Sequence, residues 1–385
     1  MKAWPKVALG QLIHRADETA VLDPLKLYHE VTIKLWGKGV LSRGKVLGSD
    51  VVSVRRVVRE NQLILSKIDA RNGAIGLVPP ELDGAIVSND FPSFAFNDIG
   101  QCDPAFMGWL VRSTPFVDLC KAASEGTTNR VRIKEDRFLD QQIALPPLAE
   151  QQALVARLNS LTEKTRQLEA HLDAADNASA ALLLSLHHKL GSDRTVRLGD
   201  IIELHEVTEP IRVEGQYPQV GVRGFGGGLF AKAAITGSGT AYKSFNRLYT
   251  DAIVLSQVKG WEGAIALCPA ELEGMFVSPE YRTFRCKPTE ASPAYLGELF
   301  RTEWFWSRLQ EATRGVGARR ERTRPEQFLN IQLPMPGLVD QLKIAEILAK
   351  QVPLKAKHAA IRAANAALLP ATLERVFQSR ETSHA

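Results

Sequence analysis

Short apolar runs broken by turn-forming residues fill most of the chain before residue 145. Segments 63–65 and 85–87 are such runs, and Gly, Pro and Asn residues lie near both of them. This pattern predicts short β-strands joined by tight turns. The pattern changes at Leu145-Pro146-Pro147, because Pro is common at the residues that begin a helix. We therefore expect a mixed α/β domain that is followed by a helix.

The segment after Pro147 has the residue pattern of a coiled-coil helix. It contains neither Gly nor Pro from 148 to 190, and apolar or small residues recur at alternating steps of four and three. The seam consists of Leu154, Leu158, Leu161, Thr165, Leu168, Leu172, Ala175, Ser179, Leu182 and Leu186. Charged residues such as Glu163 and Arg166 lie off this seam, as in an a/d heptad pattern. About 40 residues of helix would span roughly 60 Å.

A second helical segment follows Pro336, and its seam is less regular. Apolar residues recur every seven positions in it, at Ile347, Leu354, Ile361 and Leu368. Pro353 falls inside this run and is expected to break or kink the helix, because it removes one backbone donor. We expect the two helical segments to pack as an antiparallel coiled coil. The alternative is that each helix covers its own domain.

The two halves of the chain are an internal repeat. Segments 65–94 and 255–284 are identical at 13 of 30 positions without a gap. The same offset of 190 residues relates Phe138 to Phe328 and Gln151 to Gln341. Solenoid repeats have about 20–50 residues, so this unit is a whole domain. We expect a first domain over 1–146, a first helix over 147–191, a second domain over 192–335 and a second helix over 336–380.

The composition is that of a soluble globular protein. The chain has 385 residues, of which 45% are hydrophobic and 24% charged. It has no run of about 18 apolar residues, and its N-terminus lacks the apolar segment of a signal peptide, so we expect no membrane partner and a cytoplasmic location. The net charge of +5 is compatible with a nucleic-acid partner. No two of the four cysteines form a C-x-x-C pair, which favours reduced thiols over a zinc site.

Several motifs, taken in their order along the chain, resemble one known family. Segments 66–74 and 82–90 resemble stretches of target-recognition domains, and 145–152 resembles the junction into a conserved helix. Segment 335–341 is a weaker copy of that junction. With the duplication and the long helices, these motifs make the chain resemble the specificity (S, HsdS-type) subunits of type I restriction-modification enzymes over nearly its whole length.

The resemblance implies both a fold and a function. The fold would be two mixed α/β target-recognition domains with pseudo-twofold symmetry, separated by two long helices that form an antiparallel coiled coil. Each domain would read one half of a bipartite site in double-stranded DNA, and the helices would set the spacing. Two methyltransferase (M) subunits that carry S-adenosylmethionine would dock on the chain and methylate adenine. Restriction (R) subunits can join such complexes. The chain itself would bind no cofactor.

Two basic segments occupy matching places just before the two helices. Segment 126–134 contains Thr128, Asn129, Arg130 and Arg132, and segment 314–324 contains Arg314, Arg319, Arg320 and Arg322. Arginine binds phosphate or the edge of guanine bidentately. We interpret both segments as DNA-contacting loops. A solvated run of charge is the alternative.

A turn inside each domain supplies further candidates. Lys67, Arg71 and Asn72 lie on the first turn, and Lys259 and Trp261 lie on the second. Glycine follows at matching positions while the tips differ, as expected for two domains that read different sequences. Ordinary drift of loop sequence is the alternative. Lys243, which lies beside Tyr242 and near Phe245, is a candidate phosphate contact.

Motifs for catalysis are missing from the sequence. It has no [ND]-P-P-[YF] motif for a flipped adenine and no G-x-x-x-x-G-K-[ST] loop for a nucleotide. We therefore expect no catalytic residue and no bound metal in this chain. Two other hypotheses stay open. One is a coiled-coil scaffold without DNA specificity, and the other is a nuclease whose acidic residues are too scattered to recognise.

Overall fold

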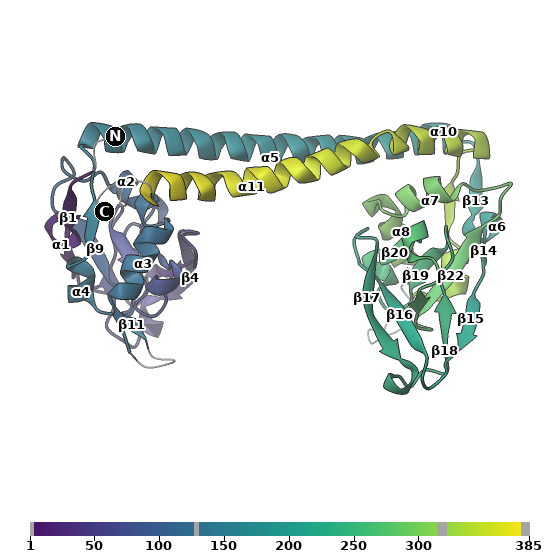
Figure 1. Cartoon of the computed structure of the whole chain (residues 1–385), viewed down its shortest axis with the longest axis horizontal. Helices are drawn as coiled ribbons and strands as arrows, with labels where there is room; N and C mark the ends of the chain where they lie inside the picture. Colours follow the sequence, from purple (N-terminus) through teal and green to yellow (C-terminus); the bar gives the residue numbers. More distant parts are fainter. Residues whose placement is uncertain (1–3, 127–130, 314–321, 379–385) are drawn as a thin grey trace. The chain divides into compact units, whose positions relative to one another are not determined.

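The computed structural model describes residues 4–126, 131–313 and 322–378. Helices and strands are both abundant, which confirms the expected mixed class (Figure 1). The chain divides into two compact units, which we call unit 1 (1–170 with 360–385) and unit 2 (171–359). Unit 1 therefore contains both a long N-terminal segment and the end of the chain. Among the described residues, no helix has the length and apolar character that crossing a membrane requires.

Unit 1 contains two four-stranded sheets. One has the strand order β2-β9-β6-β7 and the other β4-β3-β8-β5, while β1 pairs with β12 and β10 with β11. The strands are β1 (Lys6–Ala8), β2 (Ile13–Ala16), β3 (Leu27–Ile33), β4 (Val40–Leu47), β5 (Arg56–Val57), β6 (Leu63–Leu65), β7 (Ile75–Leu77), β8 (Ile86–Val87), β9 (Ser93–Phe96), β10 (Ser124–Glu125), β11 (Arg132–Ile133) and β12 (Gln142–Ala144). The helices are α1 (Leu9–Leu12), η1 (Gly48–Asp50), η2 (Ala70–Asn72), η3 (Pro80–Leu82), α2 (Pro104–Leu110), α3 (Thr114–Ala122) and α4 (Glu135–Leu139).

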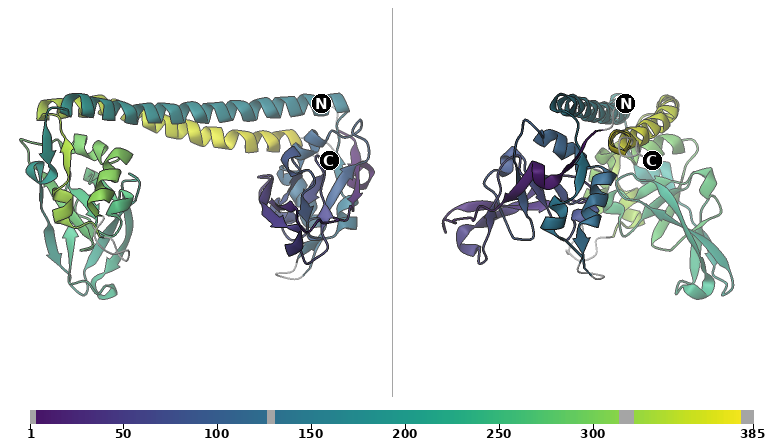
Figure 2. Two further views of the ribbon diagram at one scale, coloured as in Figure 1. Left: turned by 180° about the vertical axis from the view of Figure 1, so that it is seen from behind. Right: turned by 60° about the vertical axis from the view of Figure 1, so that its left-hand side comes forward.

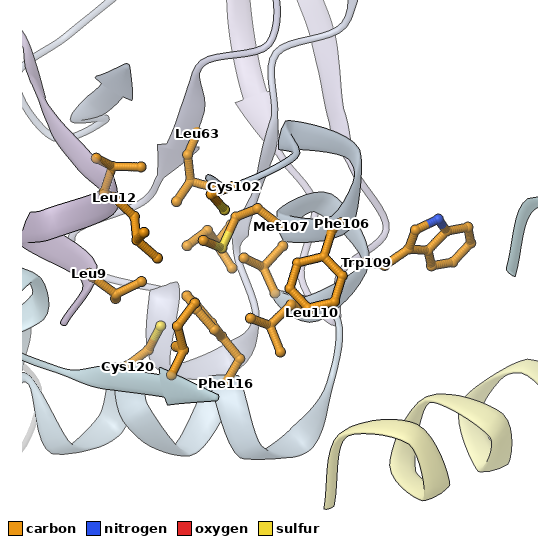
Figure 3. Packing of buried hydrophobic residues seen from close by; sticks show 14 of the residues in the cluster. Leu9, Leu12, Leu63, Cys102, Phe106, Met107, Trp109, Leu110, Phe116 and Cys120 are labelled. Atoms are coloured by element: carbon orange, nitrogen blue, oxygen red, sulfur yellow. The ribbon is translucent and has the colours of Figure 1, made fainter. Parts of the chain in front are cut away.

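The core of unit 1 lies between the first of these sheets and helices α1 to α4. Leu9, Phe106 and Phe116 meet at its centre, as Figure 3 shows. The end of the chain completes this core, since Phe377 packs edge-on against Phe106 with ring centroids 5.9 Å apart. Trp109 points away from the cluster (Figure 3) and donates from Nε1 to Asn159 Oδ1 at 3.0 Å.

Unit 2 has the same order of elements, except that it adds β15 and that its described residues form no counterparts of β10 and β11. Its sheets run β14-β22-β19-β20 and β15-β18-β21-β16-β17, and β13 pairs with β23. The strands are β13 (Thr195–Arg197), β14 (Ile202–Leu204), β15 (Val207–Pro210), β16 (Gln216–Val222), β17 (Leu229–Thr236), β18 (Ser244–Arg247), β19 (Ile253–Ser256), β20 (Ile265–Leu267), β21 (Phe276–Val277), β22 (Tyr281–Cys286) and β23 (Gln332–Pro334). The helices are α6 (Leu198–Ile201), η4 (Gly237–Gly239), η5 (Gly260–Glu262), η6 (Ala270–Leu272), α7 (Pro293–Leu299), α8 (Glu303–Thr313) and α9 (Pro325–Leu329).

Three further helices contain the long segments that the sequence predicts. They are α5 (Leu148–Gly191), α10 (Leu338–Ala349) and α11 (Val352–Gln378). Pro353 lies in the first turn of α11, where a missing N–H removes no helical hydrogen bond. Pro370 is inside α11, and sequence reasoning did not weigh it. Both Figure 1 and Figure 2 show the yellow end of α11 beside the first turns of α5 at unit 1.

The helices meet through a seam that is shifted from the predicted one. In unit 1, Asn365 of α11 donates to the carbonyl of Thr165 at 3.0 Å, and Arg362 pairs with Glu169 at 2.6 Å. In unit 2, His358 contacts Asp176 at 3.0 Å, and Ser179 bonds Gln351. The predicted second seam is wrong, because Ile347, Leu354, Ile361 and Leu368 are 40–51% exposed. On α5, Leu158 and Leu172 are buried as predicted, whereas Leu168 and Leu182 are 37% and 40% exposed.

The contacting side chains explain the shift. The positions that face the other helix are often polar, such as Glu169, Asp176, Gln351 and Asn365. Each of these side chains forms a hydrogen bond with a residue of the other helix. A search for apolar periodicity overlooks such a seam. It finds the neighbouring apolar positions instead, and those stay partly exposed.

A buried glutamine joins the start of each long helix to its own unit. Gln151 accepts from Asp103 N at 2.8 Å and donates to the carbonyls of Gln101 and Pro146 at 2.9 and 2.8 Å. In unit 2, Gln341 accepts from Ser292 N at 2.9 Å and donates to the carbonyls of Glu290 and Pro336. Both side chains are fully buried. The match at the 190-residue offset therefore preserves a set of three hydrogen bonds.

We expect Gln151→Ala to destabilise unit 1 by about 3 kcal/mol, since it removes the partners of three backbone groups. Urea unfolding followed by tryptophan fluorescence measures this loss. Gln152→Ala is the matched control, because Gln152 is the exposed neighbour on the same helix. A loss below about 1 kcal/mol would show that water replaces the amide.

His187 occupies in unit 2 the place that Phe377 has in unit 1. It is fully buried, and its Nδ1 bonds the hydroxyl of Tyr295. Its Nε2 has no hydrogen-bond partner among the described residues, and Trp304 lies edge-on with ring centroids 4.6 Å away. Desolvation, and then the charges of His188 and Arg308, lower the pKa of His187 to about 4. The ring is therefore neutral near pH 7.

The lowered pKa of His187 predicts that unit 2 is acid-sensitive. An unfolded histidine binds its proton near pH 6.5, so between about pH 6.5 and 4 the unfolded state holds more protons. Stability is complete above that window and falls through it, by about 2 kcal/mol between pH 7 and 5. Urea unfolding at the two pH values tests this. His187→Phe, which copies unit 1, should remove the difference, whereas His188→Ala at the exposed neighbour should keep most of it, because desolvation of His187 is the largest cause of its lowered pKa.

Candidate nucleic-acid interface

The two turns that carry candidate residues have one frame and different tips. In unit 1 the η2 turn (66–74) ends at Gly73 with φ of 76°, and in unit 2 the η5 turn (256–264) ends at Gly263 with φ of 69°. Ser66 Oγ accepts from Asp69 N, and Ser256 Oγ accepts from Lys259 N, both at 3.2 Å. This backbone geometry requires the glycine that both repeats have. The residues between the serine and the glycine are free to differ.

Two of the three predicted cations of unit 1 that the structure describes are already paired with carboxylates. Lys67 Nζ lies 2.7 Å from Glu135, and Arg132 lies 2.9 Å from Asp90. The side chain of Asn72 reaches Asp69 at 3.5 Å. Arg71 is half-buried and forms no ion pair with a described carboxylate. Only Arg71 therefore offers an uncompensated charge on this turn.

Unit 2 repeats this pairing at matching positions. Arg322 lies 3.0 Å from Glu280, which matches the pair of Arg132 and Asp90 at the same offset. Lys259 lies 3.5 Å from Glu262 on the η5 turn. Trp261 is 37% exposed at the tip of that turn. Lys243 is exposed just before β18.

The remaining candidates lie outside the described residues. They are Thr128, Asn129, Arg130, Arg314, Arg319 and Arg320. The described residues that follow these segments bond to the two turns. Ile133 N donates to the carbonyl of Lys67 at 2.8 Å, and Thr323 N donates to the carbonyl of Gln257 at 2.9 Å. The described residues that follow each basic segment therefore lie beside the η2 turn in unit 1 and the η5 turn in unit 2.

Sequence reasoning named Lys243 but missed that each unit has a span of sequence with several exposed cations and no acidic residue. Residues 31–49 and 215–250 contain no Asp or Glu. Each span has four exposed cations, and none of them pairs with a carboxylate of the described residues. They are Lys34, Lys38, Arg43 and Lys45 in unit 1, and Arg223, Lys232, Lys243 and Arg247 in unit 2. We call these two sets the hairpin cations, since β3–β4 and β16–β17 supply most of them. A count of acidic residues in windows along the sequence would have found them.

The arrangement favours binding over chemistry. Desolvation raises the pKa of Cys102, Cys120 and Cys286 to about 12, so these thiols stay protonated and unreactive. Within the part of the chain that the structure describes, no three His, Cys, Asp or Glu residues gather to hold a metal ion. Unpaired exposed cations beside a turn with variable tips form a surface suited to a polyanion that is read by sequence.

Comparison with known proteins supports the fold alone. No family model and no curated protein matches the sequence. The HsdS subunit from Thermoanaerobacter tengcongensis has 21% sequence identity and a TM-score of 0.57, and the match covers 98% of this chain and 97% of that one. A chain solved for the complex assembly and conformational transition of the type I R-M system has 20% identity and a TM-score of 0.64, with coverage of 99% and 97%. The resemblance seen in the sequence motifs is therefore confirmed for the fold.

Proposed function

We propose that the chain is the non-catalytic specificity subunit of a type I restriction-modification complex. Each unit would read one half of a bipartite site in double-stranded DNA. The observation that carries this proposal is the hairpin cations, four exposed Lys and Arg side chains in each unit that form no ion pair with a described carboxylate. Non-specific phosphate contacts supply most of the affinity for DNA. The variable tips of the η2 and η5 turns, with Arg71, Asn72 and Trp261, would then supply specificity.

The long helices would act as an antiparallel coiled coil that sets the distance between the half-sites. Within unit 1, contacts pair Glu169 with Arg362 and Thr165 with Asn365, so the residue numbers on the two helices run in opposite directions. The polar pairing supports a fixed register, since each partner is satisfied only in one alignment. Sliding one helix along the other would leave these groups without partners.

The partly exposed apolar lines on the helices are the proposed docking site for the methyltransferase. In unit 1 this line contains Leu168, Ile361 and Leu368, and in unit 2 it contains Leu182, Ile347 and Leu354. Apolar residues at heptad spacing fit a partner helix laid alongside them. We propose two M subunits, each with its own S-adenosylmethionine, and R subunits as further partners. Catalysis would reside in those subunits, in the cytoplasm.

Genome-wide mapping of methylated adenines tests this function. The chain is co-expressed with a candidate methyltransferase subunit from the same genome, and methylated positions are read by sequencing. A split motif with two short specific halves and a fixed gap is the expected result. Exchange of residues 67–72 for 257–262 should alter one half of the motif and leave the other unchanged.

Other outcomes would favour the other two hypotheses. Failure of the pure chain to bind DNA at any salt concentration, with the methyltransferase still bound, would favour a coiled-coil scaffold. Mg²⁺-dependent cleavage by the pure chain would favour a nuclease.

A further inference from the structure

Each unit holds one exposed aromatic residue in a left-handed backbone conformation at a hairpin tip. Trp36, between β3 and β4, has a φ of 61° and is 70% exposed. Phe225, between β16 and β17, has a φ of 53° and is 71% exposed. Outside Gly, Asn and Asp this conformation is uncommon, because the Cβ is crowded. A ring that stays about 70% exposed gains little burial on folding, so folding alone does not account for either residue.

Both tips are fixed against the turn that carries the candidate reading residues. Trp36 N donates to the carbonyl of Asn72 at 2.9 Å, and Gly37 N donates to that of Gly73 at 3.0 Å. In unit 2, Phe225 N donates to the carbonyl of Glu262 at 2.7 Å. At the tip of unit 2, the residue after Phe225 has no space for a side chain, since a Cβ on Gly226 would lie 2.9 Å from the carbonyl oxygen of Arg301. The backbone is thus held in place while the ring projects into solvent.

The surroundings of the two rings are basic. Lys34, Lys38 and Arg71 lie on the tip of unit 1 and on the turn beside it, and Arg223 lies on the tip of unit 2. The carbonyl that Phe225 N bonds belongs to Glu262, whose carboxylate lies 3.5 Å from Lys259. Trp306 supports Phe225 edge-on, with ring centroids 6.1 Å apart. A preorganised ring among unpaired cations has the chemistry that recognises a nucleobase face next to phosphates.

We propose that Trp36 and Phe225 stack on nucleobases of the bound DNA, beside the bases that the η2 and η5 turns read. This inference rests on the proposed function. Apolar side chains inserted at a base step unstack the duplex locally. The ordered backbone lowers the entropy lost when the ring is fixed on binding. The left-handed backbone conformation then directs each ring into solvent, where it can meet the DNA.

Asparagine at either position separates a binding role from a structural one, because Asn tolerates the left-handed backbone. We expect Trp36→Asn and Phe225→Asn to raise the Tm of the full-length chain and to weaken its binding to a random-sequence DNA duplex. The loss should be about 5-fold to 100-fold for each ring. The slope of log Kd against log salt should stay unchanged, since no phosphate contact is lost. Trp36→Phe should restore most of the affinity.

Three results would overturn the stacking role. If both Asn variants bind DNA like the unmodified chain while alanine at the hairpin cations weakens binding, the stacking inference is wrong and the proposed function stands. If the unmodified chain shows no salt-dependent DNA binding, both are wrong. If the Asn variants bind DNA normally and lose the co-purifying methyltransferase, the rings contact protein.

Discussion

Removing one heptad from both helices should change the spacing of the methylated motif and abolish methylation at the original spacing. The matched deletion takes 170–176 from α5 and 355–361 from α11. It keeps the contacts of Glu169 with Arg362 and of Ser179 with Gln351. Seven residues shorten a helix by about 10 Å, which corresponds to at most about three base pairs of DNA.

A heptad is the appropriate unit for this deletion because it nearly preserves helix phase. Deleting seven residues turns the helix end by about 20°, whereas deleting five or six would turn it much further. Adenine methylation mapped by sequencing in cells gives the new spacing directly. The control replaces Ala174 and Ala175, which are exposed, by serine and should leave the spacing unchanged. Retention of the original spacing in the deletion variant would rule out the helices as the ruler.

Alanine at all four hairpin cations of unit 1 should weaken DNA binding by about tenfold to a thousandfold at 0.15 M salt. Each phosphate contact adds about −0.9 to the slope of log K against log salt. If all four cations contact phosphate, the slope of the variant should be less steep by up to about four times that value. The four residues are Lys34, Lys38, Arg43 and Lys45, all of them exposed and without a described carboxylate partner. The matching set in unit 2 should behave alike.

Two controls separate charge from other effects of these substitutions. Lys34→Arg with Lys38→Arg keeps the charge and should keep both the affinity and the salt slope. Lys67→Ala removes a cation that Glu135 already neutralises at 2.7 Å, so its effect on the slope should be small. An unchanged salt slope in the fourfold alanine variant would show that DNA lies elsewhere on the unit.

The fold could be predicted from the sequence wherever a local pattern and the repeat agreed. The strand-rich texture and the helix after Pro147 rest on residues close in sequence, and the domain-sized repeat rests on identities at a fixed offset of 190 residues. The seam between the helices could not be predicted in this way. Its polar side chains are stabilising only when their hydrogen-bond partners on the other helix are present, as for Glu169, Asp176, Gln351 and Asn365. Polar pairs of this kind leave no hydrophobic period in either helix.

The candidate site, like the fold, could be predicted from the sequence only in part. The basic segments drew attention to Arg132 and Arg322, and the variable turns to Lys67 and Lys259; the structure pairs all four with carboxylates. Asp90 and Glu280, the partners of Arg132 and Arg322, lie 42 positions away, so counting charge along the sequence could not find them. The hairpin cations were visible as acid-free spans. They are recognised by the absence of Asp and Glu from the span and not by a run of Lys and Arg.

The end of the chain has a consequence for the order in which the protein is made. Leu373 and Phe377 belong to the core of unit 1, together with Phe106 and Leu158. Unit 2 is contiguous along the chain, whereas unit 1 is completed only by residues after 360. A ribosome adding about 5–20 residues per second takes on the order of 10–40 seconds from residue 170 to residue 377. Unit 1, which begins earlier along the chain, is therefore the unit that completes its core last, and this open core must be kept from aggregating until Phe377 has been synthesised.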